Sequence, residues 1–230
     1  MNPRSSDDLT ATFARLGGEE DQKVWSELWD DLCHQGSVYE DSFPALPFLT
    51  AIATGRAAGE PTEAVLMAGL IVSAADEEHT DRYAREIAEL LPVSRGLLDA
   101  TDDVSAFVYM LQCVLALEGE RVWSAARLEG LMEEEYEVDC PHCSSDLFIA
   151  FGEHGTFASA GDYVSADPVT SDLLPTAPAD LDPLPARLRH MALEAGHEEV
   201  ARGLTHLFGR AVCPDCEGEF TVSDQVEERY

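Results

Sequence analysis

Apolar residues recur at helical spacing through most of the first 135 residues. Between residues 20 and 34, Val24, Trp25, Leu28, Trp29 and Leu32 fall on one stripe, which is the pattern of an amphipathic helix. Capping residues, glycines and prolines divide the rest of this region in the same way. The pattern predicts helices over residues 7–17, 20–34, 42–54, 62–75, 80–91, 104–118 and 120–135.

Two prolines bear on these helices. Pro47 lies inside the apolar pattern of residues 42–54, where it is expected to kink or shorten the helix. Pro92 follows the stripe of residues 80–91 and is expected to end that helix.

The helices pair by spacing into hairpins over residues 20–54, 61–92 and 103–135. Their starts lie roughly 40 residues apart, within the range of two-helix repeats. One hairpin buries too little apolar surface to be stable alone, so stacking would complete the core. The fold class predicted is therefore mainly α, an α-solenoid-like stack of antiparallel helical hairpins with a small β zinc-ribbon module.

A resemblance points the same way. The segment Asp31–Ala53 reads DLCHQGSVYEDSFPALPFLTAIA. It resembles the opening repeat of bacterial HEAT/armadillo-like helical proteins, in which a short HQG…Y…S…A(L/V)P.L turn joins two helices. The resemblance covers about residues 20–135. It implies an α-solenoid fold and a scaffold or binding role, and it supplies no catalytic residues.

The pattern changes after Arg127, because no lysine or arginine occurs from residue 128 to 186. Short apolar runs here predict strands over 137–139, 147–151, 156–164 and 220–222, and helices over 186–195 and 197–209. The acidic tail after residue 223 is expected to be mobile. The predicted organisation is a helical-repeat domain over 1–136, a zinc-ribbon-like module over 137–167 plus 211–223, a Pro-rich linker over 168–185 and a helical hairpin over 186–210.

Two short cysteine motifs carry the one sharp chemical signal. They are Cys140-Pro-His-Cys143 and Cys213-Pro-Asp-Cys216. Each CxxC turn places two sulfurs close together, and a tetrahedral Zn²⁺ takes four thiolates at about 2.3 Å. The pair predicts one structural zinc per chain held by Cys140, Cys143, Cys213 and Cys216. The 69 residues between the motifs are many for a zinc ribbon, so the helical pair near 186–210 must be an excursion that returns.

The remaining candidates are weaker. His142 lies between two cysteines that already point at the metal, so it is not expected to be a ligand. Cys33 and Cys113 lie in helical apolar patterns and are expected to be small buried side chains. His197-Glu-Glu-Val-Ala201 lacks the second histidine of a zinc-protease helix, and the residue before Cys213 is valine where a zinc deaminase has proline.

A thiol-redox protein is the main alternative. Cys140-Pro-His-Cys143 also matches the active-site motif of thioredoxin-like oxidases, in which the first cysteine begins a helix. Here the residues that follow predict a turn and a strand. The second motif would also be left without a role.

The charge limits the partners. Against 45 acidic residues stand 14 basic ones, which gives a formal net charge of -31. Such a chain repels nucleic-acid phosphates and anionic lipid. No apolar run is long enough to span a bilayer, and no secretory signal opens the chain, so a cytoplasmic protein without membrane contact is expected.

The sequence as a whole predicts a non-enzymatic interaction scaffold whose acidic surface takes a basic protein partner, in a neutralising or regulatory role. The acidic clusters Asp76–Glu78 and Glu133–Glu135 are candidate contacts. Acidity as a general adaptation for solubility or a salty host stays open, as does regulation of transcription through protein contacts.

Overall fold

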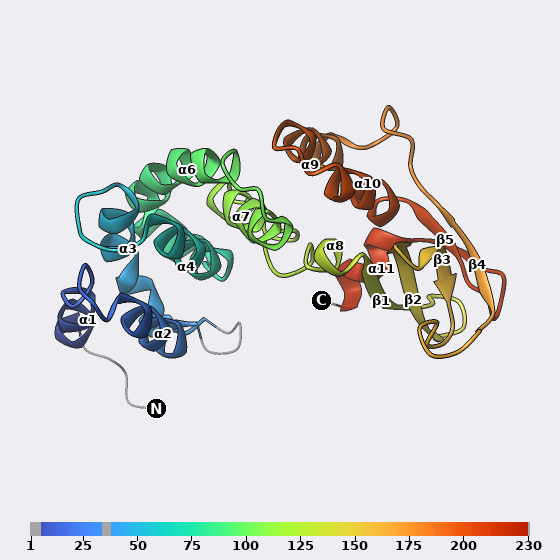
Figure 1. Ribbon diagram of the computed structural model, residues 1–230, viewed down its shortest axis with the longest axis horizontal. Helices are drawn as coiled ribbons and strands as arrows, with labels where there is room; N and C mark the ends of the chain where they lie inside the picture. Colours follow the sequence, from blue (N-terminus) through green and yellow to red (C-terminus); the bar gives the residue numbers. More distant parts are fainter. Residues whose placement is uncertain (1–5, 34–37, 230) are drawn as a thin grey trace. The chain divides into compact units, whose positions relative to one another are not determined.

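The computed structural model describes residues 6–33 and 38–229 (Figure 1). Residues 34–37, which include the His-Gln-Gly part of the resemblance, lie outside the described residues. The chain divides into two compact units. Unit 1 comprises the residues up to Ala100 together with Tyr109–Ala125, and unit 2 comprises Thr101–Val108 together with the residues from Ala126 onward.

Unit 1 is built from helices. The helices predicted over 7–17, 20–34, 62–75 and 104–118 are confirmed, most with slightly shorter bounds. The elements are α1 (Ser6–Phe13), α2 (Asp21–Leu32), the 3₁₀ helix η2 (Glu40–Ala45), α3 (Leu46–Ala53), α4 (Pro61–Ser73), α5 (Glu77–Arg82), α6 (Ala84–Leu98) and α7 (Val104–Leu117), within which the unit boundary falls.

The apolar stripe of α2 forms part of the unit 1 core. Val24, Trp25, Leu28 and Leu32 are buried. Trp29, which the stripe also included, is only half-buried, and its indole Nε1 donates a hydrogen bond to Glu63 of α4 over 2.8 Å. The helix period therefore placed the core face correctly, with one polar contact at its edge.

The two prolines behave differently. Pro47 lies in the first turn of α3, where a missing N–H costs nothing, so residues 42–54 form η2 and a shorter α3 as expected. The expectation for Pro92 is wrong, because α6 continues through it to Leu98. Leu90, Ser94 and Leu98 are buried at helical spacing on both sides of Pro92. Burial of this face offsets the hydrogen bond that the proline removes.

The helix predicted over residues 120–135 is wrong. Only α8 (Gly130–Glu133) is helical there, and Ala126 and Glu134 have left-handed backbone angles. The Glu120 carboxylate accepts hydrogen bonds from the backbone N–H groups of Val122 and Trp123, which favours a turn. The third predicted hairpin therefore lacks its second helix.

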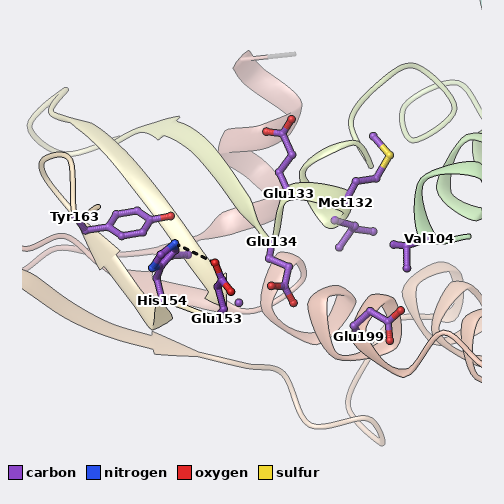
Figure 2. A pocket seen from close by; sticks show the side chains of 11 residues that line it. Val104, Met132, Glu133, Glu134, Glu153, His154, Tyr163 and Glu199 are labelled. Atoms are coloured by element: carbon purple, nitrogen blue, oxygen red, sulfur yellow. Dashed lines mark ion pairs between the residues drawn. The ribbon is translucent and has the colours of Figure 1, made fainter. Parts of the chain in front are cut away.

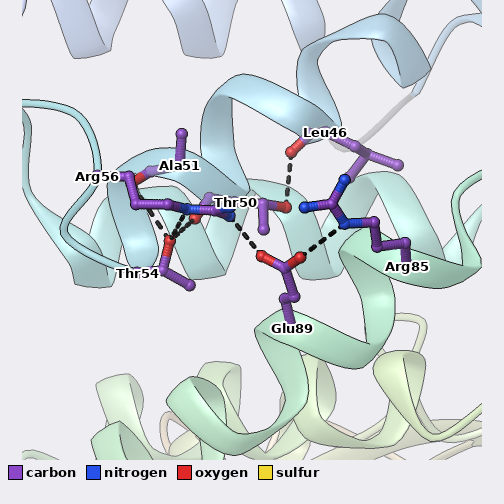
Figure 3. A network of polar contacts seen from close by, with 7 residues as sticks. All are labelled: Leu46, Thr50, Ala51, Thr54, Arg56, Arg85 and Glu89. Atoms are coloured by element: carbon purple, nitrogen blue, oxygen red, sulfur yellow. Dashed lines mark hydrogen bonds and ion pairs between the residues drawn. The ribbon is translucent and has the colours of Figure 1, made fainter.

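A polar network joins the loop after α3 to α6 in unit 1 (Figure 3). Glu89 accepts a hydrogen bond from Arg85 Nε over 2.9 Å and also pairs with Arg56. Arg56 in turn donates to Thr54 over 2.9 Å. These groups are largely exposed, so we expect the network to orient the loop more than to stabilise the fold.

Unit 2 contains a six-stranded sheet in which neighbouring strands are antiparallel and follow the chain order. The strands predicted over 137–139, 147–151 and 220–222 are confirmed with shifted ends, and the one predicted over 156–164 is shorter. The strands are β1 (Glu135–Asp139), β2 (Asp146–Gly152), β3 (Gly155–Ser159), β4 (Thr170–Leu174), β5 (Arg210–Val212) and β6 (Glu219–Thr221).

The buried face of this sheet follows the strand period. Tyr136 of β1 pairs with Ile149 of β2, and Val138 pairs with Leu147. All four side chains are buried. Alternation of inward apolar and outward acidic residues therefore fixes the register of β1 on β2.

Two helices lie between β4 and β5 in the chain. They are α9 (Pro183–Glu194) and α10 (Glu198–Leu207), close to the predicted ranges. They pack against each other, and Gly203 of α10 lies close to Leu131 and Phe151, because a Cβ there would meet both. The excursion expected between the two cysteine motifs is therefore present, and it returns to the sheet.

Two segments of unit 2 are more ordered than expected. Residues 168–185, expected as a linker, contain β4 and the start of α9. The tail after residue 223, expected to be mobile, belongs to α11 (Val222–Arg229), so that expectation is wrong. Val222 and Val226 of this helix are fully buried, and α11 packs against β1. Burial of these two valines explains why an acidic segment is helical.

The fold class predicted from the sequence is also wrong. About half of the residues are helical, and unit 2 contains a six-stranded antiparallel sheet of half-barrel form. No solenoid of helical hairpins is found in the part of the chain that the structure describes. The protein is mixed α and β, because residues 120–129 turn where a repeat needed a helix and the short apolar runs after 135 join one sheet.

Candidate metal centre

The four cysteines of the two motifs lie together in unit 2. Their Sγ atoms all lie within 4.8 Å of one another, so the group could hold a metal ion. Cys140 Sγ is 3.7 Å from Cys216 Sγ, and Cys143 Sγ is 3.7 Å from Cys213 Sγ. Each sulfur of one motif therefore lies close to a sulfur of the other motif, although 70 or more positions separate the two cysteines in the sequence.

The spacing of the sulfurs fits a tetrahedral metal. Four thiolates at about 2.3 Å from one ion, arranged as a tetrahedron, lie about 3.8 Å from each other. The two cross-motif distances of 3.7 Å agree with this value. The set contains soft thiolates alone, which select zinc, iron–sulfur or monovalent copper chemistry over magnesium or calcium.

The two turns have the same backbone structure. In the first, Cys140 N–H donates to Ser145 O over 2.9 Å and Ser144 N–H donates to Cys140 O over 2.8 Å. In the second, Cys213 donates to Gly218 and Glu217 donates to Cys213, both over 2.9 Å. The first turn joins β1 to β2 and the second joins β5 to β6.

The residue after each motif has an unfavourable backbone conformation. Ser144 has φ 61° and Glu217 has φ 60°, in the left-handed region that few non-glycine residues adopt. Each such residue costs of the order of 1 kcal/mol, which the surrounding structure must offset. The two turns therefore share this left-handed residue as well as their hydrogen bonds.

Burial differs between the two cysteines of each motif. Cys140 and Cys213 are buried, whereas Cys143 and Cys216 are exposed. Burial raises the pKa of the Cys213 thiol to about 12. Hydrogen bonds from Ser145, whose Oγ lies 3.3 Å from the Cys143 sulfur, lower the pKa of Cys143 to about 6. One face of the sulfur cluster therefore meets solvent.

His142 points away from a ligand role, as expected. Its Nε2 lies 2.9 Å from the backbone oxygen of Glu219, the first residue of β6 directly after the second turn, and can only donate to that oxygen. Its backbone N–H lies 3.4 Å from Cys140 Sγ. The histidine thus connects the two turns directly. The sequence showed the position of His142 but not this contact.

The remaining cysteines and His197 are structural. Burial raises the pKa of the Cys33 and Cys113 thiols to about 12, which suits the small apolar role expected of both. His197 is buried, donates through Nε2 to Thr101 O over 2.8 Å, and lies against the ring of Phe107. The His197-Glu-Glu199 sequence therefore belongs to packing within unit 2.

A separate cavity of unit 2 is lined by acidic side chains (Figure 2). Glu133 and Glu134 of the predicted cluster Glu133–Glu135 line it, together with Glu153 and Glu199. Glu134 pairs with Arg202 over 3.1 Å, and Glu153 faces His154 over 3.5 Å. Of these four carboxylates, that of Glu134 is therefore the one paired here with an arginine, and the cavity keeps a negative lining.

The other predicted acidic cluster, Asp76–Glu78, begins α5 in unit 1. Asp76 accepts a hydrogen bond from the His79 backbone N–H over 2.8 Å and caps the helix. Asp76 therefore has a local structural role, as is usual for Asp at this position.

Among the described residues, no helix is both long and apolar enough to cross a membrane. Comparison with known proteins finds no matching family model, no similar curated protein and no similar solved structure. The resemblance to HEAT/armadillo-like repeats thus finds no support, and the functional conclusion rests on the geometry of the four cysteines.

Proposed function

We propose that Cys140, Cys143, Cys213 and Cys216 hold one structural Zn²⁺ and that the chain is a non-enzymatic binding protein. The observation that carries the metal is the 3.7 Å spacing of the paired sulfurs. Four thiolates complete a tetrahedral shell and leave no open position for a substrate or a reactive water. Zinc in such a shell acts by holding protein segments together.

The segments that the zinc would hold lie at the two ends of the sheet. The first turn belongs to the β1–β2 pair and the second to the β5–β6 pair. β5 and β6 have only three residues each and offer few hydrogen bonds. Binding of the ion would therefore supply folding free energy where the strands supply little.

We further propose a protein partner with a basic surface. The formal net charge is -31, and much of the small basic complement is already used within the described chain. The arginines that form ion pairs with carboxylates there include Arg15, Arg56, Arg85, Arg95, Arg202, Arg210 and Arg229. The excess of carboxylates favours a cationic protein and disfavours nucleic acid.

Affinity capture from lysate at low and at high salt tests the partner. We expect a basic protein to bind at low salt and to be lost at high salt, and the purified pair to show the same dependence. Capture of no specific protein, or of one whose binding ignores salt, contradicts the proposal.

A thiol-redox protein is the second candidate, favoured by the exposure of Cys143 and by its pKa of about 6. Against it, β2 follows the first motif, where a thioredoxin-like site has a helix that begins at the first cysteine. Metal analysis combined with thiol alkylation separates the two candidates. One zinc per chain with unreactive thiols excludes the redox function, whereas a metal-free protein with fast alkylation favours it.

A further inference from the structure

The contact between His142 and Gly218 joins the two cysteine turns through protein atoms alone. His142 belongs to the first turn, and its ring lies on Gly218 of the second, so that a Cβ on Gly218 would lie 2.3 Å from the His142 ring carbon Cδ2. The ring Nε2 also donates a hydrogen bond to Glu219 O over 2.9 Å. The two contacts fix the ring against the last residue of the second turn and the first residue of β6.

The glycine at position 218 is explained by this ring. Gly218 has no left-handed backbone angle, so the turn itself does not need glycine there. The matching position of the first turn is Ser145, whose side chain lies 3.3 Å from the Cys143 sulfur. The two turns share a backbone but differ at this position, because in the second turn the space of a side chain is filled by the His142 ring.

We propose that His142 is a positioning residue of the metal centre, which seats the first turn on the second and so brings the four sulfurs to metal-binding distance. This role rests on the proposed zinc site. The ring Nε2 donates to the Glu219 carbonyl and the ring carbon Cδ2 lies against Gly218, so His142 acts on the metal through the placement of Cys140 and Cys143. Contacts of this kind beyond the ligands typically change metal affinity 10–100-fold.

Two variants of the full chain approach the same contact from opposite sides. His142→Ala removes the ring, and Gly218→Ala displaces it while leaving the backbone angles allowed. Zinc affinity is measured by competition with a chromophoric chelator. We expect each variant to bind zinc about 10–100-fold more weakly than the wild-type chain. The double variant should be no weaker than either single one, because the methyl group added at position 218 displaces nothing once the ring is gone.

Matched controls make the test specific. His142→Gln keeps a side-chain N–H donor and should recover part of the affinity. His154→Ala removes an exposed histidine of the same unit, in the β2–β3 turn, and should leave the affinity unchanged.

The outcomes separate the two proposals. Wild-type affinity in both His142→Ala and Gly218→Ala, or fully additive losses in the double variant, overturns the positioning role while the zinc site stands. A wild-type chain that takes up no zinc overturns the zinc site and the positioning role with it.

Discussion

The guanidinium of Arg229 lies 2.9 Å from the carboxylate of Glu137, although 92 residues separate them in the chain. Arg229 is in the last turn of α11, which follows β6 directly, and Glu137 lies on β1. The same guanidinium lies 3.4 Å from Asp139 and 3.5 Å from Asp146. The end of the chain is therefore tied to the first strand of the sheet, beside the first cysteine turn.

Replacement of Arg229 by glutamine should weaken this connection. The arginine is partly exposed, so we expect a loss of about 0.5–1 kcal/mol in the stability of unit 2. Hydrogen exchange of the β1 amides should become faster. Glu228→Gln, on the exposed side of α11, serves as the control and should leave exchange unchanged. Equal β1 exchange in Arg229→Gln and the wild-type chain would show that α11 is held by its buried valines alone.

Loss of a proposed metal ligand should cost far more than loss of a buried cysteine elsewhere. Cys213→Ser opens the sulfur cluster and should cost about 3 kcal/mol or more, as part of the binding free energy of a structural zinc. Cys33→Ser places a hydroxyl in an apolar site and should cost about 1–2 kcal/mol. Hydrogen exchange of the β-strand amides measures the first change. Tryptophan fluorescence measures the second, because all three tryptophans lie in unit 1.

Comparable losses in the two variants would contradict the prediction, because they would mean that the sulfur cluster contributes no more than ordinary packing. Addition of a strong chelator to the wild-type chain should reproduce the Cys213→Ser pattern of exchange.

The close approach of α4 and α7 depends on a glycine. A Cβ at Gly69 would lie 2.4 Å from the sulfur of Cys113 and 2.9 Å from its Cα. Gly69→Ala should therefore overpack unit 1 and destabilise it by about 1–3 kcal/mol. Gly96 of α6 is the matched control, since a Cβ there meets nothing within 4 Å.

Gly96→Ala should be neutral or stabilise α6 by up to about 1 kcal/mol, the helix-propensity gain of alanine over glycine. Urea unfolding followed by tryptophan fluorescence measures both variants. A Gly69→Ala variant as stable as Gly96→Ala would show that the two helices separate at little cost.

Much of the helical unit follows from the periods of the sequence. The apolar stripe of α2 can be recognised in the sequence because its apolar residues recur about every 3.6 residues and charged residues occupy the other face. The continuation of α6 through Pro92 cannot be predicted from the sequence, because it depends on the tertiary packing that buries Leu90 and Leu98. Local turn chemistry at Glu120 likewise overrides the apolar pattern that suggested a further helix.

The four metal ligands could be predicted from the sequence, whereas the contacts that position them could not. Two CxxC motifs indicate a four-thiolate site through spacing alone. The contact of His142 with Gly218 forms only when the β1–β2 and β5–β6 pairs come together in the folded chain. No local sequence pattern predicts that approach. The acidic residues of α11 led to the prediction of a mobile tail. The prediction missed Val222 and Val226, whose burial on β1 orders the segment.

We expect His79 to make the stability of unit 1 depend on pH. Its Nδ1 lies 2.8 Å from Asp76 and its Nε2 lies 3.0 Å from Glu40, while Phe43 stacks on the ring. Both carboxylates can only accept, so the arrangement needs a doubly protonated ring. Desolvation acts to lower the pKa of His79, but hydrogen bonds and charge from Asp76 and Glu40 outweigh it, so the pKa is raised.

A raised histidine pKa stabilises the folded form below the unfolded value, about 6.5, and this contribution is lost as pH rises through the folded pKa. The stability advantage of the wild-type chain over His79→Gln should therefore be full below pH 6.5 and shrink as the pH rises from about 6.5 through the raised pKa of His79. Proton NMR titration of His79 and urea unfolding at several pH values test this. An advantage independent of pH would show that the ring acts by stacking on Phe43 alone.

Metal content and coordination test the central claim most directly. Elemental analysis of the purified chain, joined to X-ray absorption at the zinc edge, should find one zinc per chain with four sulfur neighbours at about 2.3 Å. Cys143 should resist alkylation until the zinc is removed. A metal-free chain whose exposed Cys143 is alkylated at once would contradict the account. The four sulfurs would then lie close together without binding a metal ion.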